Sequence, residues 1–520
     1  MSKKIKIVTV VLLLVVIMTG FYKTNEVSAA TVQNNRVMLV YDSQNDVKED
    51  QKNIDTLQRS LTSMNLRVKT VEQSQYQKGM LTDKYLGVIT MINWRQVGIT
   101  NQEFLEDRTK FTGIKLHIGE NLTQSEISQL GVKVQKIYQQ QLILKNNGNK
   151  ESLPFSNSIT VITQPAKDSQ QIGTLSTQQT GAKTYPFGYI NGKNGYLPYF
   201  ESEGLSLMTQ VQLIGKLFGR LGRFKPLLTI SQVTPYTNLK RLDELSLYCY
   251  KHEIPFAVST TSVSDNTEMK AFDRFTATLR NVESRGGIIF LQTPEVSNGD
   301  DTDGNILEQT FLTYIVSLAR HQVFPVGISS AGFWNQDKVL RSNSLKYADH
   351  WLLLPNGKKV TYVKRDNDSE ITKQSFFAMP ATSLNNVRKN SETNFVIPTA
   401  LTIPMPYGKK ALDQVEAEIE NLNLSWYDPV NDNLQTSINT DTTSLQYQHG
   451  DYLANGKAED IQVSNSAYQK QFSDGQPQSL FSNYFKIQGN ILAIFFAIIM
   501  IILLIFIFIG QRIYWNRFKR

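Results

Sequence analysis

The chain has 520 residues, of which 41% are hydrophobic and 19% are charged. This composition excludes a collagen-like rod, a coiled-coil rod and a wholly disordered chain, and the length predicts two or three domains. The single cysteine, Cys249, excludes an intramolecular disulfide framework and a cysteine-based zinc cluster.

The N-terminal segment has the three parts of a secretory signal peptide. Basic residues at 3–6 precede an apolar run over residues 7–18, and small residues follow at 27–30. We expect residues 1–29 to form the signal peptide, because the apolar run is shorter than the ~20 residues that span a bilayer. The alternative is an uncleaved N-terminal anchor, and both versions export the chain that follows.

The C-terminal segment predicts one membrane-spanning helix at residues 490–510. Residues 491–509 contain no charged or strongly polar side chain, Tyr514 and Trp515 follow them, and the tail at 511–520 is basic. Interfacial aromatic residues and a basic flank are typical of a transmembrane helix with a cytoplasmic tail. We therefore expect a single-pass protein of the cell membrane, with the bulk of the chain extracellular.

The formal net charge of +8 reflects this topology more than it reflects a partner. Residues 1–29 contribute +3 and residues 511–520 contribute +4, so that +1 remains for everything between them. The exported part is therefore nearly neutral, and nucleic acid is not an expected partner. A single cysteine in an exported chain also suggests a cell envelope in which disulfides are not the stabilising device.

Residues 36–133 alternate between strand-like and helix-like segments. Strands are expected at 36–41, 66–71, 85–92 and 113–119, and a polar helix at 47–64. This alternation predicts a parallel αβ layer, similar to flavodoxin-like or amidotransferase-like layers. The segment has no cysteine nucleophile and no glycine fingerprint for a phosphate, so we interpret it as a non-catalytic interaction layer.

Residues 134–203 predict a β-rich extension. Alternating runs at 141–145 and 158–163 are separated by turns rich in Asn and Gly. The aromatic residues between 185 and 200 could offer faces for stacking on sugars. The alternative, which we favour, is that they form the core of the sheet.

Residues 204–430 predict a parallel barrel or sheet of strands and helices. A helix at 204–221 leads to three strands with two intervening helices. The strands are expected at 225–233, 254–259 and 288–291, and the helices at 239–252 and 269–284. The working loops of such a fold lie at the carboxyl ends of its strands. Cys249 lies on the apolar face of the first of these two helices, where packing is its expected role.

This order resembles the polysaccharide deacetylase (NodB-homology) superfamily, in particular an exported deacetylase-like branch of it. The matching motifs are Val233–Thr237, Ile254–Phe256, Arg285–Gly287 and Leu291. The resemblance covers about residues 225–295 and extends to about 430. It implies a deacetylase-like (β/α) barrel.

The resemblance also implies which positions carry the chemistry of active members. There, an aspartate pair supplies a catalytic base and a metal ligand, and two histidines four residues apart complete a site for a divalent ion that activates water. In this sequence the aspartate pair falls on Ser231 and Gln232, and the histidine pair falls on Gln292 and Val296. These side chains are neutral, and valine cannot bind a metal. We therefore predict a degenerate site with no catalytic residue, metal or cofactor.

Further residues near this site are candidates for ligand contacts. Tyr236 and Trp334 could stack on a sugar ring, although for Trp334 we favour the alternative, local packing against the barrel. The acidic loop at 298–305 has some features of a calcium loop, but Thr310 stands where such a loop needs Glu. A solvated acidic loop is the alternative for this segment.

The remaining chain is expected to complete the barrel and then to reach the membrane. Further strands are expected at 323–328, 359–363, 394–397, 400–403 and 424–428, and a helix at 410–422. Residues 431–489 are rich in small polar residues and predict a stalk or linker, of which 446–453 could pack on the barrel.

These features lead to one principal functional hypothesis and two alternatives. The first is a membrane-anchored extracellular pseudo-deacetylase that binds a glycan, or a protein of polysaccharide assembly, in cell-surface or exopolysaccharide production. The second is a divergent carbohydrate hydrolase or deacetylase that uses other carboxylates, for example Asp243, Glu295 or Asp300. The third is a non-enzymatic surface scaffold.

Overall fold

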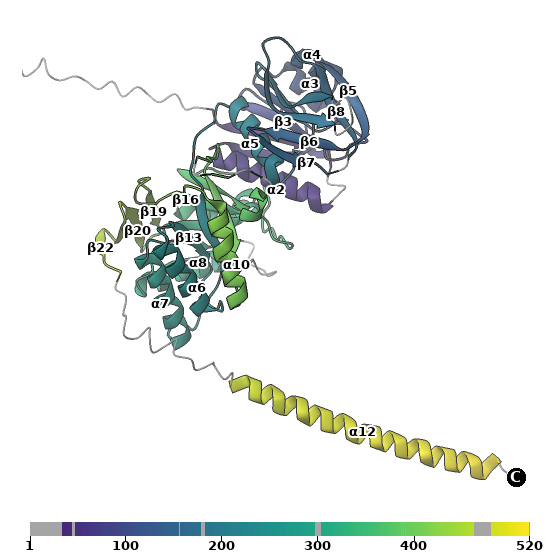
Figure 1. The fold of residues 1–520 in the computed structure, drawn as a ribbon, viewed down its shortest axis with the longest axis vertical. Helices are drawn as coiled ribbons and strands as arrows, with labels where there is room; N and C mark the ends of the chain where they lie inside the picture. Colours follow the sequence, from purple (N-terminus) through teal and green to yellow (C-terminus); the bar gives the residue numbers. More distant parts are fainter. Residues whose placement is uncertain are drawn as a thin grey trace, which may run out of the picture. The chain divides into compact units, whose positions relative to one another are not determined.

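The computed structural model describes residues 34–43, 47–154, 156–177, 183–296, 303–385, 387, 389–390, 392–461 and 480–518. The chain divides into two compact units, Met1–Gln462 and Val463–Arg520 (Figure 1). The boundaries expected near residues 133, 203 and 430 therefore all fall inside the first unit. The expected signal peptide lies outside the described residues.

The first part of this unit contains a nine-stranded sheet, in which the strand order is β2-β1-β3-β4-β11-β10-β9-β6-β7. Five strands pair in parallel: β2 (Arg67–Glu72), β1 (Arg36–Tyr41), β3 (Gly87–Met91), β4 (Ile114–Ile118) and β11 (Asn194–Leu197). The antiparallel remainder is β10 (Thr184–Asn191), β9 (Gln170–Thr177), β6 (Leu142–Asn146) and β7 (Asn149–Ser152). The parallel strands and the β-rich segment thus form one continuous sheet. Strands β5 (Lys133–Gln140) and β8 (Ser156–Gln164) form a separate ribbon.

Helices cover both faces of this sheet. Helices α2 (Val47–Ser63) and α5 (Gly204–Leu217) pack on the face that carries Val37 and Leu39, whereas α3 (Gln102–Lys110) packs on the face that carries Met38 and Val40. This division follows from the alternation of side chains along a strand. The short helix α4 (Gln124–Leu130) begins with a capping box between Thr123 and Glu126. The aromatic residues of β10 and β11 are core residues, because Phe187, Tyr189 and Tyr196 are all buried.

The second part of the unit is a closed barrel of seven parallel strands, as the expected barrel fold requires. The strands are β12 (Leu227–Val233), β13 (Phe256–Thr260), β14 (Ile288–Gln292), β15 (Gly327–Ala331), β16 (His350–Leu354), β17 (Gln374–Pro380) and β18 (Thr399–Pro404). The helices that follow the strands are α6 (Leu239–Lys251), α7 (Lys270–Ser284), α8 (Asn305–Arg320), α9 (Lys338–Ser342) and α10 (Lys409–Leu422). Cys249 is fully buried on α6, as expected for packing, and burial raises the pKa of its thiol to about 12.

Several strand predictions for the second half of the barrel are wrong. The strand expected at 323–328 begins at Gly327 instead, and residues 359–363 and 424–428 form no strand. Residues 394–397 hold only an isolated bridge between Phe224 and Phe395. Strands β16 and β17, which the sequence analysis missed, complete the barrel in their place.

Helix α2 covers part of the outer surface of the barrel as well as its own sheet. The guanidinium of Arg59 lies 4.8 Å from the ring centre of Phe377 on β17, and its Nη1 donates to the carbonyl oxygen of Ala378 at 2.8 Å. Asp55 accepts from Arg59 Nε at 2.8 Å, and both side chains are buried. Burial raises the pKa of Asp55, and the charge of Arg59 opposes this shift. The outer surface of the barrel at β16 and β17 is therefore covered by α2, a helix that also packs on the N-terminal sheet.

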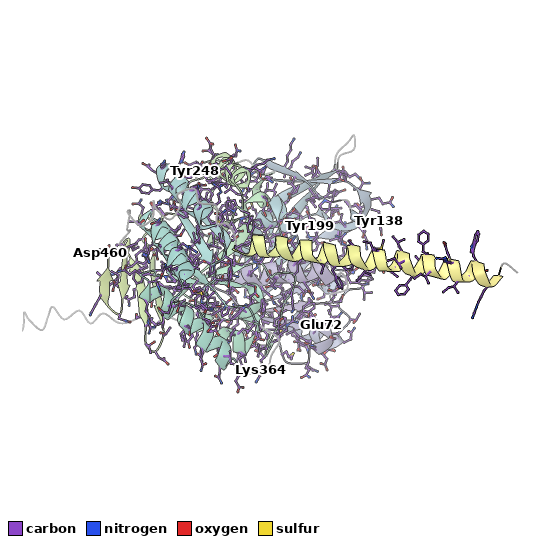
Figure 2. All side chains as sticks on the ribbon, turned by 90° about the horizontal axis from the view of Figure 1, so that it is seen from below. Glu72, Tyr138, Tyr199, Tyr248, Lys364 and Asp460 are labelled. Carbon is purple, nitrogen blue, oxygen red and sulfur yellow. The ribbon has the colours of Figure 1, made fainter. Side chains whose placement is uncertain are left out.

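Residues 355–373, which we call the strap, connect β16 to β17 and bind the edge of the N-terminal sheet. Asp368 forms a salt bridge with Arg36 at 3.1 Å, and the backbone N–H of Ser369 donates to the carbonyl oxygen of Val68 at 2.8 Å. Buried Asp337 fixes the middle of the strap by accepting from the backbone N–H groups of Val363 and Lys364. Lys364 and Glu72, at the end of β2, are labelled in Figure 2.

The segment after the barrel corrects the predicted stalk. Residues 435–459 form an antiparallel sheet of β19 (Gln435–Asn439), β20 (Ser444–Gln448), β21 (Asp451–Ala454) and β22 (Lys457–Glu459). Its alternate residues Ile438, Leu445 and Tyr452 are buried, and Ile438 forms a bridge to Ala348 of the barrel. The prediction was wrong here because a half-buried strand needs only every second residue to be apolar. Residues 462–479 lie outside the described residues.

The second unit contains α12 (Leu480–Phe518). Its segment Phe495–Trp515 is 21 residues long and apolar enough to cross a membrane, and it is the one such helix among the described residues. This segment overlaps the helix expected at 490–510 and extends past it by five residues.

Candidate functional site: the carboxyl-end rim of the barrel

The pairing of the strands shows which side chains point into the barrel. Phe290 on β14 and Phe376 on β17 come from strands that are not neighbours, yet their ring centres are 6.1 Å apart. They must therefore meet inside the barrel. Gln292 follows Phe290 by two residues and shares its face. Gln292 is in register with Ser329, whose hydroxyl lies 2.8 Å from that of Ser259.

Ser231 and Gln232 lie where β12 departs from regular pairing. The register of β12 with β13 shifts between Ile230 and Val233, and Gln232 has a φ of +61°. Ser231 is buried, and its backbone oxygen accepts from the N–H of Met405 at 2.9 Å. The Ser231 hydroxyl donates to the carbonyl oxygen of Ile403 at 3.4 Å. The side chain of Gln232 is exposed.

The four positions that the resemblance assigns to metal chemistry thus carry neutral groups at the carboxyl ends of β12 and β14. Gln292 is half-buried, and Val296 packs against the hydrophobic core. Over the described part of the chain, no three His, Cys, Asp or Glu side chains are close enough together to hold a metal ion. A hydrolytic water activated by a metal or by a carboxylate has no evident partner among these four residues.

The carboxylates considered as alternative catalytic groups do not form a cluster around Ser231, Gln232 and Gln292 either. We call these three neutral residues the floor of the site. Asp243 lies on α6 and binds Arg285 Nη1 at 2.6 Å and Asn281 Nδ2 at 3.1 Å. Glu295 is exposed on the loop after β14. Asp300 and most of the acidic loop 298–305 lie outside the described residues.

Tyr236 stands beside a groove at the same rim. The groove has a volume of about 380 Å³ and lies between the loop after β12, the loop after β13 and the helices α7 and α8. Its lining mixes apolar and polar side chains: Pro235, Tyr236, Val263, Ser264, Asp265, Asn266, Met269, Ala271, Phe272 and Tyr314. Burial raises the pKa of Tyr314, and the nearby carboxylates of Glu295 and Asp265 add to this effect. The groove therefore joins an aromatic surface to hydrogen-bonding groups.

A second exposed tyrosine, which the sequence analysis missed, lies on the adjoining loop. Tyr407 follows β18, the strand that pairs with β12, and its carbonyl oxygen accepts from Asn238 Nδ2 at 3.4 Å. Tyr236 is 89% exposed and Tyr407 is 79% exposed. The only signal in the sequence was an aromatic residue in the Pro-Tyr-Gly turn that ends an expected strand.

Of the two interpretations of Trp334, the structure supports local packing and not contact with a glycan. Trp334 is 3% exposed in the turn that follows β15, and its ring centre lies 6.2 Å from that of Phe333. The turn is closed over by α2, since an added Cβ on Gly332 would meet Asp55 and Arg59. Trp334 therefore packs locally and leaves no ring face for a ligand.

Buried histidines elsewhere in the chain belong to structural networks. His117 Nδ1 lies 2.8 Å from Glu126 Oε1, and Arg108 reaches the same oxygen at 2.9 Å. The other ring nitrogen of His117 lies 2.9 Å from the carbonyl oxygen of Glu120. Both ring nitrogens thus have partners within the protein, and the side chain is buried.

Comparison with known proteins adds no family to this geometry: no protein-family model matches the chain, and no curated protein matches it. The site is therefore defined by its own residues. It is the rim at the carboxyl ends of β18, β12 and β13, with a neutral floor and two exposed tyrosines.

Proposed function

We propose that this chain is a membrane-tethered protein that binds a glycan without hydrolysing it. The observation that carries the proposal is the groove beside Tyr236, which lies beyond the carboxyl ends of β12 and β13. Ser231, Gln232 and Gln292, the neutral side chains at the carboxyl ends of β12 and β14, lie at the same end of the barrel. Tyrosine offers an apolar ring face together with a hydroxyl, and saccharides need both apolar contact and hydrogen bonds. Asp265 and Asn266 provide such hydrogen-bonding groups in the same groove.

The resemblance to polysaccharide deacetylases supports the choice of a glycan over other ligands. In this proposal the barrel is a deacetylase-like (β/α) barrel that keeps the saccharide-binding rim and has lost the metal chemistry. The N-terminal sheet, as a flavodoxin-like or amidotransferase-like layer, then serves as a binding and support layer. Both assignments are part of the proposal.

The proposed location is the outer face of the cell membrane. The apolar segment Phe495–Trp515 supports tethering, and the basic residues Arg512 and Arg517 support a cytoplasmic C-terminus by the positive-inside rule. Export through an N-terminal signal peptide would place the barrel on the extracellular side. A role in cell-surface or exopolysaccharide production follows from this location and from the glycan.

The test is retention of the full-length protein, in detergent, on insoluble cellulose and chitin. We expect the wild-type protein to be retained on at least one of them. The variant Tyr236→Ala should lose about tenfold in affinity, because an aromatic side chain that stacks on a ring of its ligand contributes on the order of 1–3 kcal/mol, the range known for nucleic-acid bases. The matched control is Tyr250→Ala, since Tyr250 is 59% exposed at the far end of α6. Absence of retention, or equal loss in both variants, would contradict the proposal.

A parallel assay separates binding from hydrolysis. We expect no release of acetate from acetylated chito-oligosaccharides and no change on addition of Zn²⁺. Release that depends on Glu295, tested with Glu295→Gln, would instead support the divergent hydrolase. If this chain binds a partner protein and has no affinity for any polysaccharide, the result would support the third hypothesis, a non-enzymatic surface scaffold.

A further inference from the structure

The two tyrosines at the rim are unusual in their exposure. Among the described residues of the first unit, Tyr236 and Tyr407 are the two most exposed large hydrophobic side chains. They belong to neighbouring strands of the barrel, because β12 and β18 pair from Leu227 to Ser231. Single exposed apolar side chains are ordinary on a protein surface, but a row of them at one rim marks an interaction site.

The loops that carry these tyrosines are held in place by hydrogen bonds between side chains and the backbone. The N–H of Tyr236 donates to Thr234 Oγ1 at 3.2 Å, and the N–H of Thr234 donates to Thr237 Oγ1 at 2.9 Å. Asn238 connects this turn to the carbonyl oxygen of Tyr407. A ligand that binds here therefore has little loop ordering to complete, which favours affinity.

The row continues beyond Tyr236 into the groove. Met269 at the start of α7 is 57% exposed and lines the groove together with Tyr314 of α8. The loops after β18, β12 and β13 thus present Tyr407, then Tyr236, then the groove. Neighbouring strands lie ~4.8 Å apart, so three strand ends alone span about 10 Å. The groove extends the surface further, to Phe272 of α7 and Tyr314 of α8, so that the whole rim is longer than a disaccharide.

From this arrangement we propose that the rim binds a saccharide chain along the direction β18–β12–β13, with Tyr407 as an outer subsite and the groove beside Tyr236 as the inner subsite. The inference rests on the proposed function and adds to it the length and the direction of the ligand. The groove pairs its apolar faces with the carboxylate of Asp265 and the amide of Asn266, and none of the described residues that line it is a lysine or an arginine. This chemistry suits the hydroxyl groups of a neutral saccharide better than an anionic lipid headgroup.

The test measures affinity against chain length. Full-length protein in detergent is titrated with chito-oligosaccharides and cello-oligosaccharides of two, four and six residues, with isothermal titration calorimetry as the readout. We expect the affinity in at least one series to rise about tenfold from the disaccharide to the hexasaccharide. The affinity rises with each occupied subsite because the ligand loses its translational freedom only once, whereas the contacts of every further subsite add to the binding free energy.

Variants separate the two subsites. We expect Tyr407→Ala to abolish the gain with length while the disaccharide binds as in the wild type, and Tyr236→Ala to weaken every length. Tyr250→Ala is the control and should change neither. Equal affinity for all lengths, or equal effects of Tyr407→Ala on short and long ligands, would overturn the inference and leave the proposed function standing. Absence of binding in both series would overturn the proposed function as well.

Discussion

The barrel is covered in two different ways. Around β12, β13 and β14 its cover consists of α6, α7 and α8, each of which directly follows one of these strands in the chain. Around β16 and β17 the cover includes α2, whose Arg59 binds the carbonyl oxygen of Leu353, 294 residues away. The side formed by β12, β13 and β14 is thus closed by local connections, and we call it the local side. The side formed by β16 and β17 is closed by a helix that belongs to a second sheet, and we call it the remote side.

The two sides also treat buried charge differently. On the remote side, Asp55 lies against Arg59, and both are buried. On the local side, Glu283 of α7 is buried with Oε1 accepting from the N–H of Phe324 at 2.8 Å, and its Oε2 makes no hydrogen bond within the described structure. A helix from another sheet gains specificity of position from directional polar contacts.

The largest effect is expected from breaking the remote side. We expect Arg59→Ala to destabilise the protein by about 3–5 kcal/mol, because it leaves the buried carboxyl of Asp55 without its cation. The loss should grow as the pH rises through the range in which Asp55 ionises, since burial raises the pKa of this group. Denaturant unfolding of the full-length protein in detergent at pH 5 and pH 8 measures both effects.

The control for this variant is an ion pair of the local side. Arg241 and Glu244 form a salt bridge on α6 with side chains that are 21% and 32% exposed. Arg241→Ala should cost less than about 1 kcal/mol, as partly exposed pairs do. If both substitutions have the same small effect, the ion pair of α2 does not hold the helix to the barrel.

A smaller effect of opposite sign is expected on the local side. Burial raises the pKa of Glu283 to about 8, while hydrogen bonding to Phe324 and the charge of Arg280 oppose the shift. Because the folded state holds a proton that the unfolded state releases above its ordinary pKa of 4.5, stability is greatest below that pH and falls as the pH rises to about 8. Glu283→Gln should therefore stabilise the protein at pH 9 by about 2 kcal/mol, less than the shift alone implies, because the buried amide is left partly unpaired.

The pH profile distinguishes this cause from simple packing. Unfolding curves between pH 5 and pH 9 should show a slope for the wild type that Glu283→Gln lacks. Tyr452 of β21 is buried near Glu283, and burial raises its pKa well above its ordinary value, so it should not titrate in this range. Parallel curves for the two proteins would contradict the assignment of the slope to Glu283.

The same contrast explains what the sequence could predict of the fold. The local units were predicted closely, for example the helix expected at 269–284 and found at Lys270–Ser284. The role of α2 was not, because Asp55, Gln58 and Arg59 are residues that a sequence pattern assigns to solvent. Strand β16 was missed although its apolar run ends at Pro355, since a run of five residues alone does not separate a strand from a buried helix segment.

The candidate site was predictable to a similar extent. Ser231 and Gln292 could be placed at strand ends because their strands are local and strongly apolar. The exposure of an aromatic residue beyond a strand end could not be predicted, because it depends on what the rest of the chain packs over it. The turn that carries Trp334 packs against α2 at Gly332, and Trp334 is buried, whereas Tyr407 remains 79% exposed.

The smallest effect that we predict concerns the backbone at the rim. Gln232 has a φ of +61°, a conformation that glycine adopts without steric strain. Gln232→Gly should therefore stabilise the protein by about 0.5–1 kcal/mol, the strain relieved being partly offset by the greater freedom of glycine in the unfolded chain. Gln292→Gly, within a regular strand, is the control and should destabilise it.

If Gln232→Gly stabilises the protein and also weakens retention on polysaccharide, the strained conformation is maintained for the side chain that it presents to the ligand. If it destabilises the protein, Gln232 has a packing role and the bulge in β12 is structural.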